Sequence, residues 1–275
     1  MAAKPIVFSD SLTARRAELE AEFGEPITLD ALTEHIAIFQ RGRGHRHSTD
    51  DVLTAYYALV HAPEGVREYL DLGTGIGTVG LLVLAGLAAP VRAEVVEAQD
   101  ISFRLLRENV TMNGLSEVIT MHHGDLRDLH LERRFPLITG SPPYFPLGTG
   151  IVSDDSQKAH ARFELRGDVS DYARAAKRHL AEGGRFVFCF PWAQKARALA
   201  AVRGEGFDVL EHRDVVPKEG LTPLFSVYAC ALRSNGLGGA GAPEVEGPPL
   251  VVRDAAGVHT DEMRSVRTRF GWWTG

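Results

Sequence analysis

The most chemically suggestive residues of the chain are the tetrad Ser141-Pro142-Pro143-Tyr144 and the next residue, Phe145. An amine attached to a planar ring or carbonyl group is a poor nucleophile because its lone pair is delocalised. Two acceptors on its N–H groups localise the lone pair. The Ser141 hydroxyl and the Pro142 carbonyl suit this task, since proline fixes the backbone direction. Tyr144 or Phe145 would stack on the target ring. The tetrad therefore predicts a site that holds a planar amine and catalyses by positioning, with no strong base.

A second segment, Asp71-Leu-Gly73-Thr74-Gly75-Ile-Gly, predicts a nucleotide site upstream of the tetrad. Its glycines let the backbone turn tightly and approach a ligand at the start of a helix. Asp71 would stand at the end of the preceding strand, where its carboxylate can accept from a ligand ammonium group. The pattern G-x-G-x-x-G, from Gly75 to Gly80, also occurs in dinucleotide-binding enzymes. The glycines alone therefore leave the nucleotide open.

Two further acidic residues follow predicted strands. Glu97 ends the second strand of the main pattern, where a carboxylate can accept both ribose hydroxyls, and Ala98 follows it. Asp125, followed by Leu126, comes after the third strand, where it can accept from an adenine amino group or simply belong to a turn. A nucleotide site together with an amine-holding tetrad predicts methyl transfer to a planar nitrogen.

These residues need elements to position them, and the chain alternates strands and helices from residue 68 onward. Seven strands are expected, at 68–71, 93–96, 118–122, 137–139, 185–190, 207–215 and 224–232. Helices are expected at 12–23, 52–60, 78–88, 101–113, 169–181 and 194–204, and a small strand or helix at 28–38. This order predicts an α/β fold, a Rossmann-like and mostly parallel seven-stranded sheet with helices on both faces. Its last two strands would form an antiparallel closing pair.

The organisation predicted along the chain has four parts. An N-terminal extension spans 1–47, and the main domain spans 48–233. A flexible loop rich in glycine, alanine and proline spans 234–249. A C-terminal appendage at 250–275 would fold as a strand and a short helix against the body.

With these residues in place, the chain resembles the class I S-adenosylmethionine-dependent N-methyltransferases. The resemblance rests on the glycine segment, Glu97, Asp125 and the tetrad. More narrowly, the chain resembles the bacterial tRNA adenine-N6 methyltransferase family that modifies valine tRNA. This narrower resemblance rests on residues 44–53, 109–115 and 161–164 and on the tail from Pro249. The resemblance implies S-adenosyl-L-methionine as cofactor, with Thr49 and Asp50 near its methionine end and Ala98 and Leu126 among its contacts. It implies an adenine N6 in tRNA as methyl acceptor.

The chain departs from that family at Ser141, where the adenine-N6 enzymes have Asn and cytosine-N4 enzymes have Ser. Alternative acceptors therefore stay open: cytosine N4, a protein glutamine amide, or a small molecule or peptide. An NAD(P)-dependent oxidoreductase would explain the glycines but leave Asp71 and the tetrad without roles. A catalytically silent partner protein is the remaining alternative. For a nucleic-acid substrate, Arg41, Arg43 and Arg46 are the expected phosphate contacts.

The composition restricts the other classes of function. A chain of 275 residues with 44% hydrophobic and 24% charged residues is typical of a globular protein, and its net charge of -6 gives no overall basic footprint. The chain contains no apolar run of about 18 residues, so a membrane span is not predicted. The two cysteines indicate buried thiols in a reducing, cytoplasmic setting, and the histidine spacing predicts no metal site. The oligomeric state is not indicated.

Overall fold

The computed structural model describes residues 9–44, 46–87, 90–145, 157, 164, 167–233 and 244–272. His45 and residues 161–163, which contribute to the resemblance noted above, lie outside these ranges.

The strands and helices alternate as the sequence predicts. The strands are β1 (Ile27–Ala31), β2 (Ala37–Arg41), β3 (Glu68–Leu72), β4 (Arg92–Glu97), β5 (Ile119–His123), β6 (Phe135–Gly140), β7 (Leu180–Pro191), β8 (Phe207–Val216), β9 (Phe225–Leu232), β10 (Val245–Glu246) and β11 (Leu250–Val251). The helices are α1 (Asp10–Phe23), α2 (Thr49–His61), α3 (Thr78–Gly86), α4 (Asp100–Met112), α6 (Val169–His179), the short 3-10 helix η1 (Trp192–Gln194), α7 (Lys195–Gly204) and α8 (Asp261–Arg269).

The main sheet has the order β10-β8-β9-β7-β6-β3-β4-β5, and β11 also pairs with β8. Strands β3, β4, β5, β6 and β7 run parallel to one another, whereas β9 runs antiparallel to both β7 and β8. The predicted mostly parallel sheet with an antiparallel closing pair is therefore confirmed. It has nine strands instead of seven because the two-residue strands β10 and β11 extend its β8 edge.

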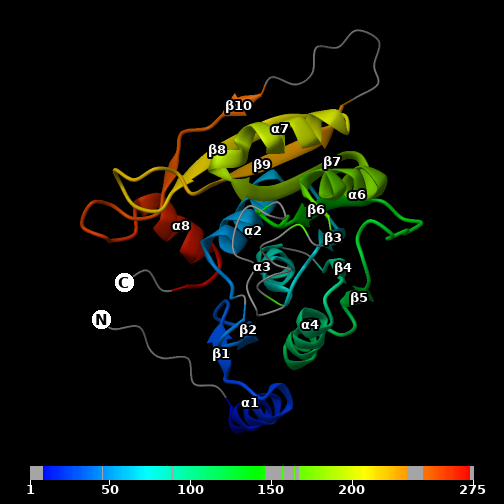
Figure 1. Cartoon of the computed structure of the whole chain (residues 1–275), viewed down its shortest axis with the longest axis vertical. Coiled ribbons are helices and arrows are strands. Elements are labelled where there is room, and N and C mark those ends of the chain that lie inside the picture. The colour runs from blue at the N-terminus through cyan, green and yellow to red at the C-terminus, as the bar shows by residue number, and fades with distance from the viewer. Residues whose placement is uncertain are drawn as a thin grey trace.

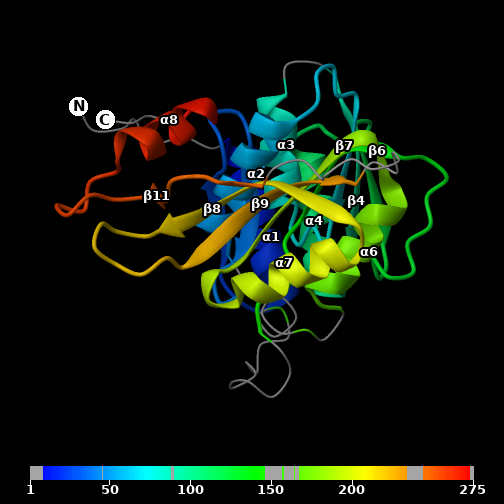
Figure 2. The same cartoon turned by 90° about the horizontal axis from the view of Figure 1, so that it is seen from above.

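The sheet separates two hydrophobic layers, because successive side chains of a strand point to opposite faces. Tyr69 of β3 packs with residues of α2, α3, α4 and α8, whereas Leu70 packs with residues of α6 and α7. Figure 2 shows α2 and α3 on one side of the strands and α6 and α7 on the other. The prediction of helices on both faces is confirmed. The two cysteines, Cys189 and Cys230, are free and buried in opposite layers.

The predicted element at 28–38 is a hairpin of two antiparallel strands, β1 and β2. The amide of Asn109 in α4 fixes its position: Oδ1 accepts from Phe39 N at 2.7 Å, and Nδ2 donates to Ile76 O at 2.9 Å. Asn109 thus joins the hairpin to the glycine turn after β3. Figure 1 shows α1, β1 and β2 together at one end of the molecule, next to α4.

Several predicted boundaries differ from the structure, and two of the differences change the element to which residues belong. The helix expected to reach residue 181 ends at His179, because Leu180 already pairs with Phe135 as the first residue of β7. The predicted flexible loop 234–249 includes strand β10, where Val245 pairs with Glu211 of β8. Residues 234–243 of that loop lie outside the described residues.

Candidate active site

The glycine turn connects β3 to α3 and needs residues without a Cβ. Gly73, Gly75 and Gly77 all have left-handed backbone angles, with φ of 63°, 61° and 96°. A Cβ on Gly73 would lie 2.1 Å from the hydroxyl oxygen of Tyr172, which α6 places beneath the turn. The turn is therefore closely packed, and its backbone is free of side chains where a ligand would approach.

Asp71 fixes this turn from below. Its side chain is buried, and the Thr74 hydroxyl donates to Oδ2 while the Thr139 hydroxyl donates to Oδ1, both at 2.6 Å. Burial raises the pKa of Asp71, and the two threonine hydroxyls act in the opposite direction. Asp71 thereby joins the glycine turn to β6, the strand that leads to the tetrad. Contact with a ligand ammonium group stays a prediction.

Glu97 orients the opposite wall at the end of β4. Its Oε2 accepts from Gly75 N at 2.9 Å, and its Oε1 accepts from Gln99 N at 2.7 Å. These bonds direct the carboxylate across the glycine turn, beside Ala98. The predicted contact of this carboxylate with ribose hydroxyls fits its place and stays untested.

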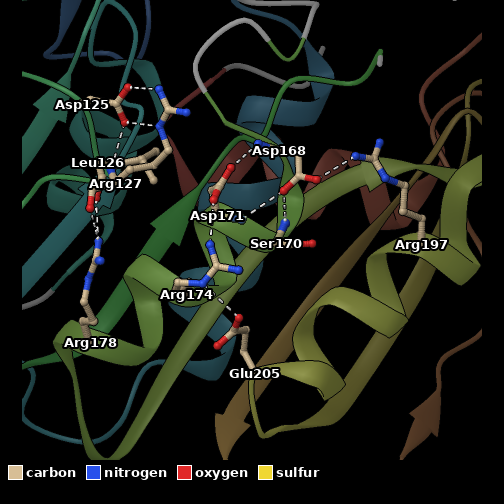
Figure 3. A network of polar contacts seen from close by, with 10 residues as sticks. All are labelled: Asp125, Leu126, Arg127, Asp168, Ser170, Asp171, Arg174, Arg178, Arg197 and Glu205. Atoms are coloured by element: carbon tan, nitrogen blue, oxygen red, sulfur yellow. Dashed lines mark hydrogen bonds and ion pairs between the residues drawn. The ribbon is translucent and has the colours of Figure 1, made fainter. Parts of the chain in front are cut away.

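Asp125 forms part of the same wall and is held by a bidentate ion pair. Arg127 Nε donates to Oδ1 at 2.9 Å, and a terminal nitrogen of Arg127 donates to Oδ2 at 2.7 Å. Arg178 of α6 donates to the carbonyls of Leu126 and Arg127, both at 2.9 Å. Figure 3 shows this group of residues beside the cap of α6. The loop after β5 is therefore fixed by two arginines that the sequence analysis did not single out.

The tetrad continues directly from β6, where Gly140 pairs with Leu72 of β3. Pro142 and Pro143 are buried, whereas Ser141 is half-buried and lines the cavity. Within the described residues the Ser141 hydroxyl makes no hydrogen bond. It is therefore available to a ligand amine, as its predicted role requires.

The two aromatic side chains after the prolines differ in their surroundings. The Tyr144 hydroxyl donates to Asp50 Oδ2 at 2.6 Å, and the Tyr144 carbonyl accepts from Gln194 Nε2 at 2.5 Å. Phe145 is 42% exposed. The sequence allowed either ring to stack on the target. Both rings line the cavity, and the hydrogen bond to Asp50 ties Tyr144 to the first turn of α2.

The first turn of α2 brings carboxylates to the cavity. Thr49, Asp50 and Asp51 all line it, and Asp51 Oδ2 accepts from Ser48 N at 3.0 Å. Burial, and then repulsion from Asp50 and Asp71, raises the pKa of Asp51. Asp50, Asp51 and Asp71 all line the cavity. These three neighbouring carboxylates favour a cationic ligand, because a positive charge relieves their mutual repulsion.

A single cavity of about 580 Å³ joins all of these groups. Every residue predicted to act in catalysis or cofactor binding lines it, and so does Phe145: Ser141, Pro142, Pro143, Tyr144, Thr49, Asp50, Asp71, Gly73, Thr74, Gly75, Glu97, Ala98, Asp125 and Leu126. Its place at the carboxyl ends of parallel strands is where such sheets bind ligands. The roles of the individual residues stay predictions.

Several lining residues had been missed. His47, Gln99, Ser102, Tyr172 and Leu224 also line the cavity. Burial lowers the pKa of His47, which favours a neutral imidazole there. None of these residues belongs to the glycine segment or the tetrad, and only the S-T-D-D run after His47 was a local signal.

The three arginines predicted to contact phosphates do not line the cavity. Arg41 is buried and forms an ion pair with Glu25, which lies between α1 and β1. Arg46 pairs with Asp30 at 3.1 Å, whereas Arg43 is exposed and has no carboxylate partner among the described residues. Arg41 is therefore held inside the protein by Glu25. Of the three arginines, Arg43 is the one whose charge is exposed without a carboxylate partner among the described residues.

Within the described residues, no group of histidine, cysteine and acidic side chains is arranged to hold a metal ion. The helices in those ranges also include none that is long and apolar enough to cross a bilayer.

Comparison with known proteins gives consistent similarities. Residues 54–201 match the family model described as the methyltransferase small domain. A tRNA1(Val) (adenine(37)-N6)-methyltransferase of Actinobacillus pleuropneumoniae is 24% identical over 204 residues, which cover 74% of this chain and 82% of the relative. A protein of the same name from Porphyromonas gingivalis is 30% identical over 160 residues, covering 56% of this chain and 62% of its own.

Two solved structures share the fold. A predicted O-methyltransferase from Agrobacterium tumefaciens superposes with a TM-score of 0.61 at 18% identity, covering 82% of this chain and 98% of its own. The structure of aTrm5 with tRNALeu gives a TM-score of 0.53 at 12% identity, covering 76% and 54% of the two chains.

Proposed function

Because the chain belongs to the methyltransferase small domain family, we propose that it methylates the exocyclic N6 amine of an adenine in tRNA. It is an S-adenosylmethionine-dependent methyltransferase, and the substrate is the part that we propose. The observation that carries the proposal is the shared cavity, in which the tetrad after β6 and the glycine turn after β3 open toward each other. The relatives named as tRNA adenine-N6 methyltransferases support the choice of acceptor.

The residues of the cavity fit the cofactor. Gly73 and Gly75 leave the backbone bare, and Asp50, Asp51 and Asp71 supply negative charge for its cationic groups. In this proposal Glu97 accepts ribose hydroxyls and Asp125 accepts an adenine amino group, which is supported by the position of both residues in the lining of the cavity. Bound S-adenosylmethionine supplies an electrophilic methyl group on a sulfonium centre.

The tetrad prepares the acceptor amine in this proposal. Ser141 Oγ and the Pro142 carbonyl accept the two N–H groups, which directs the nitrogen lone pair toward the methyl group. Methyl transfer from bound S-adenosylmethionine to this nitrogen would leave a neutral thioether, and the methylated amine would then lose a proton to water. Phe145 stacks on the base, and Tyr144 is held by Asp50 so that the tetrad keeps its orientation.

Nucleoside mass spectrometry on RNA from cells with and without the protein tests this proposal. We expect N6-methyladenosine to disappear from a tRNA fraction of the deletion strain and to return with the wild-type gene, while a Ser141→Ala, Tyr144→Ala variant fails to restore it. Loss of N4-methylcytidine in place of N6-methyladenosine would select the acceptor that Ser141 also fits. Unchanged RNA in both strains would refute a nucleic-acid substrate.

A further inference from the structure

Large apolar side chains are exposed on the segments that follow β6, β7 and β8, and two of these side chains line the cavity. Within the described residues, Phe145, Trp192, Leu221 and Leu224 are 42%, 36%, 57% and 64% exposed. Phe145 and Leu224 also line the cavity, together with Pro191, the residue before Trp192. Single exposed apolar residues are ordinary on proteins, but a group of them at the entrance of a site indicates an interaction surface.

Backbone pairing holds Trp192 next to Leu224. Trp192 N donates to Leu224 O at 3.2 Å, and Pro191 pairs with Phe225 between β7 and β9. Leu221 N donates to Lys218 O at 3.0 Å within the turn that joins β8 and β9. Glu219 N in turn donates to Arg253 O at 2.8 Å, so the tail supports this turn. Figure 2 shows the turn running out beyond the sheet beside the segment that joins β11 and α8.

The indole of Trp192 is fixed although its ring is partly exposed. Its Nε1 donates to Asp214 Oδ2 at 2.9 Å, and Asp214 also accepts from Lys195 Nζ at 2.8 Å and from the Ser226 hydroxyl at 2.7 Å. Burial acts to raise the pKa of Asp214, but these donors lower it by more. The net pKa lies below the ordinary value, so the carboxylate stays charged. A ring held in place by a charged hydrogen-bond network loses little entropy when a flat partner stacks on it.

The chemistry of the cavity limits what this surface can contact. In the proposed function, the occupant of this surface is connected to a planar amine that reaches Ser141 in the cavity, which Phe145 also lines. Bases in single-stranded loops are unstacked and bind aromatic and apolar side chains, whereas bases inside a duplex offer no free faces. Lys218, on the same turn, is exposed and has no carboxylate partner among the described residues, so it suits a neighbouring phosphate.

We propose that Trp192 and Leu224 bind an unstacked base that adjoins the methylated adenine in a single-stranded RNA loop. This rests on the proposed function and adds to it that the enzyme recognises an open loop through a neighbouring base as well as through the target.

The test uses stem-loop RNAs made from the tRNA that the wild-type enzyme methylates. In each RNA, one nucleotide beside the target adenine is replaced by an abasic nucleotide. We expect one of these changes to raise the KM of the wild-type enzyme for RNA about tenfold, the size of one lost stacking contact. Trp192→Ala and Leu224→Ala should raise the KM for the intact stem-loop by a similar factor. When the intact stem-loop is replaced by the same abasic RNA, the KM of either variant should not rise any further. Trp192→Phe should keep a KM for RNA close to that of wild type.

Val60→Ala is the matched control, since Val60 is 56% exposed at the far end of α2. Calorimetric affinity for S-adenosylmethionine should stay unchanged in Trp192→Ala, Trp192→Phe and Val60→Ala, which separates loss of docking from loss of folding. Wild-type KM values for RNA in both Trp192→Ala and Leu224→Ala would overturn the inference while leaving the proposed function intact. If the wild-type enzyme methylates no RNA, the proposed function fails, and this inference fails with it.

Discussion

At the scale of single residues, the proposed role of Ser141 rests on its hydroxyl, which lines the cavity next to Pro142 and makes no hydrogen bond within the described residues. Ser141→Ala should lower kcat about 100-fold, the typical cost of one lost electrostatic contact in a transition state. The KM for S-adenosylmethionine should stay unchanged, measured by transfer of labelled methyl groups to tRNA. Ser141→Asn should retain adenine methylation within about tenfold of wild type, since an amide oxygen also accepts from an amine.

The control for this prediction is Ser265→Ala, which removes a hydroxyl from α8, outside the cavity. Wild-type kcat in the Ser141→Ala variant would show that the Pro142 carbonyl alone holds the amine.

The carboxylate of Asp51 predicts a pH dependence of stability. Burial, and then repulsion from Asp50, raises its pKa well above the ordinary value of 3.8. The folded state therefore binds this proton more tightly than the unfolded chain, so the free energy of unfolding falls as pH rises from about 4 through the folded-state pKa. Asp51→Asn removes this decrease. Without ligand, its Tm should exceed that of wild type near neutral pH and approach it near pH 4.

Thermal unfolding between pH 4 and 8 measures this, with the exposed Asp261→Asn as control. If Asp51→Asn keeps the wild-type dependence on pH, another buried group is responsible. The same variant should bind S-adenosylmethionine more weakly, because the cavity loses negative charge.

At the scale of elements, α6 supports the glycine turn through Tyr172, so its N-terminal cap should influence cofactor binding. Asp168 Oδ1 accepts from Ser170 N at 2.8 Å and from Asp171 N at 3.1 Å, and Asp171 Oδ2 accepts from Asp168 N at 3.0 Å (Figure 3). Asp168→Ala should destabilise the protein by about 1 kcal/mol and raise the KM for S-adenosylmethionine a few-fold.

The comparison is Ser9→Ala, which removes the cap of α1, where Ser9 Oγ accepts from Leu12 N at 3.3 Å. It should cost a similar free energy of unfolding in chemical denaturation and leave the KM unchanged. A raised KM in both variants would mean that global stability, and not α6, controls cofactor binding.

The elements also show what a sequence can and cannot reveal about such a site. The glycine turn and the tetrad were predictable because each is a continuous segment at the end of a strand, and parallel strands place their carboxyl ends along one edge. Tyr172 under Gly73 was not, because nothing local to α6 reports a contact made across the sheet edge. Arg41 looked open in a basic run, but the hairpin brings Glu25 against it. Contacts between distant segments decide such cases.

At the scale of the whole molecule, the C-terminal tail belongs to the same folding unit as the cavity. Met263 and Val266 of α8 are buried in the hydrophobic layer that also contains Leu53 of α2 and Leu81 of α3. Arg269 donates to Gly86 O at 3.0 Å at the end of α3. Since α2 supplies Asp50 and α3 begins at the glycine turn, the tail packs on the two helices that form one side of the site.

Met263→Ala should therefore destabilise the entire protein, by about 2–5 kcal/mol, in one cooperative unfolding transition. Urea unfolding followed by both circular dichroism and tryptophan fluorescence measures this, and the two signals should coincide. Val258→Ala, at a side chain that is 54% exposed, should change the free energy of unfolding by less than about 0.5 kcal/mol. Saturating S-adenosylmethionine should recover part of the loss, about 2.7 kcal/mol at a ligand concentration of 100 times Kd, because only the folded cavity binds it. Two separate transitions in Met263→Ala would instead show that the tail unfolds independently of the domain that holds the cavity.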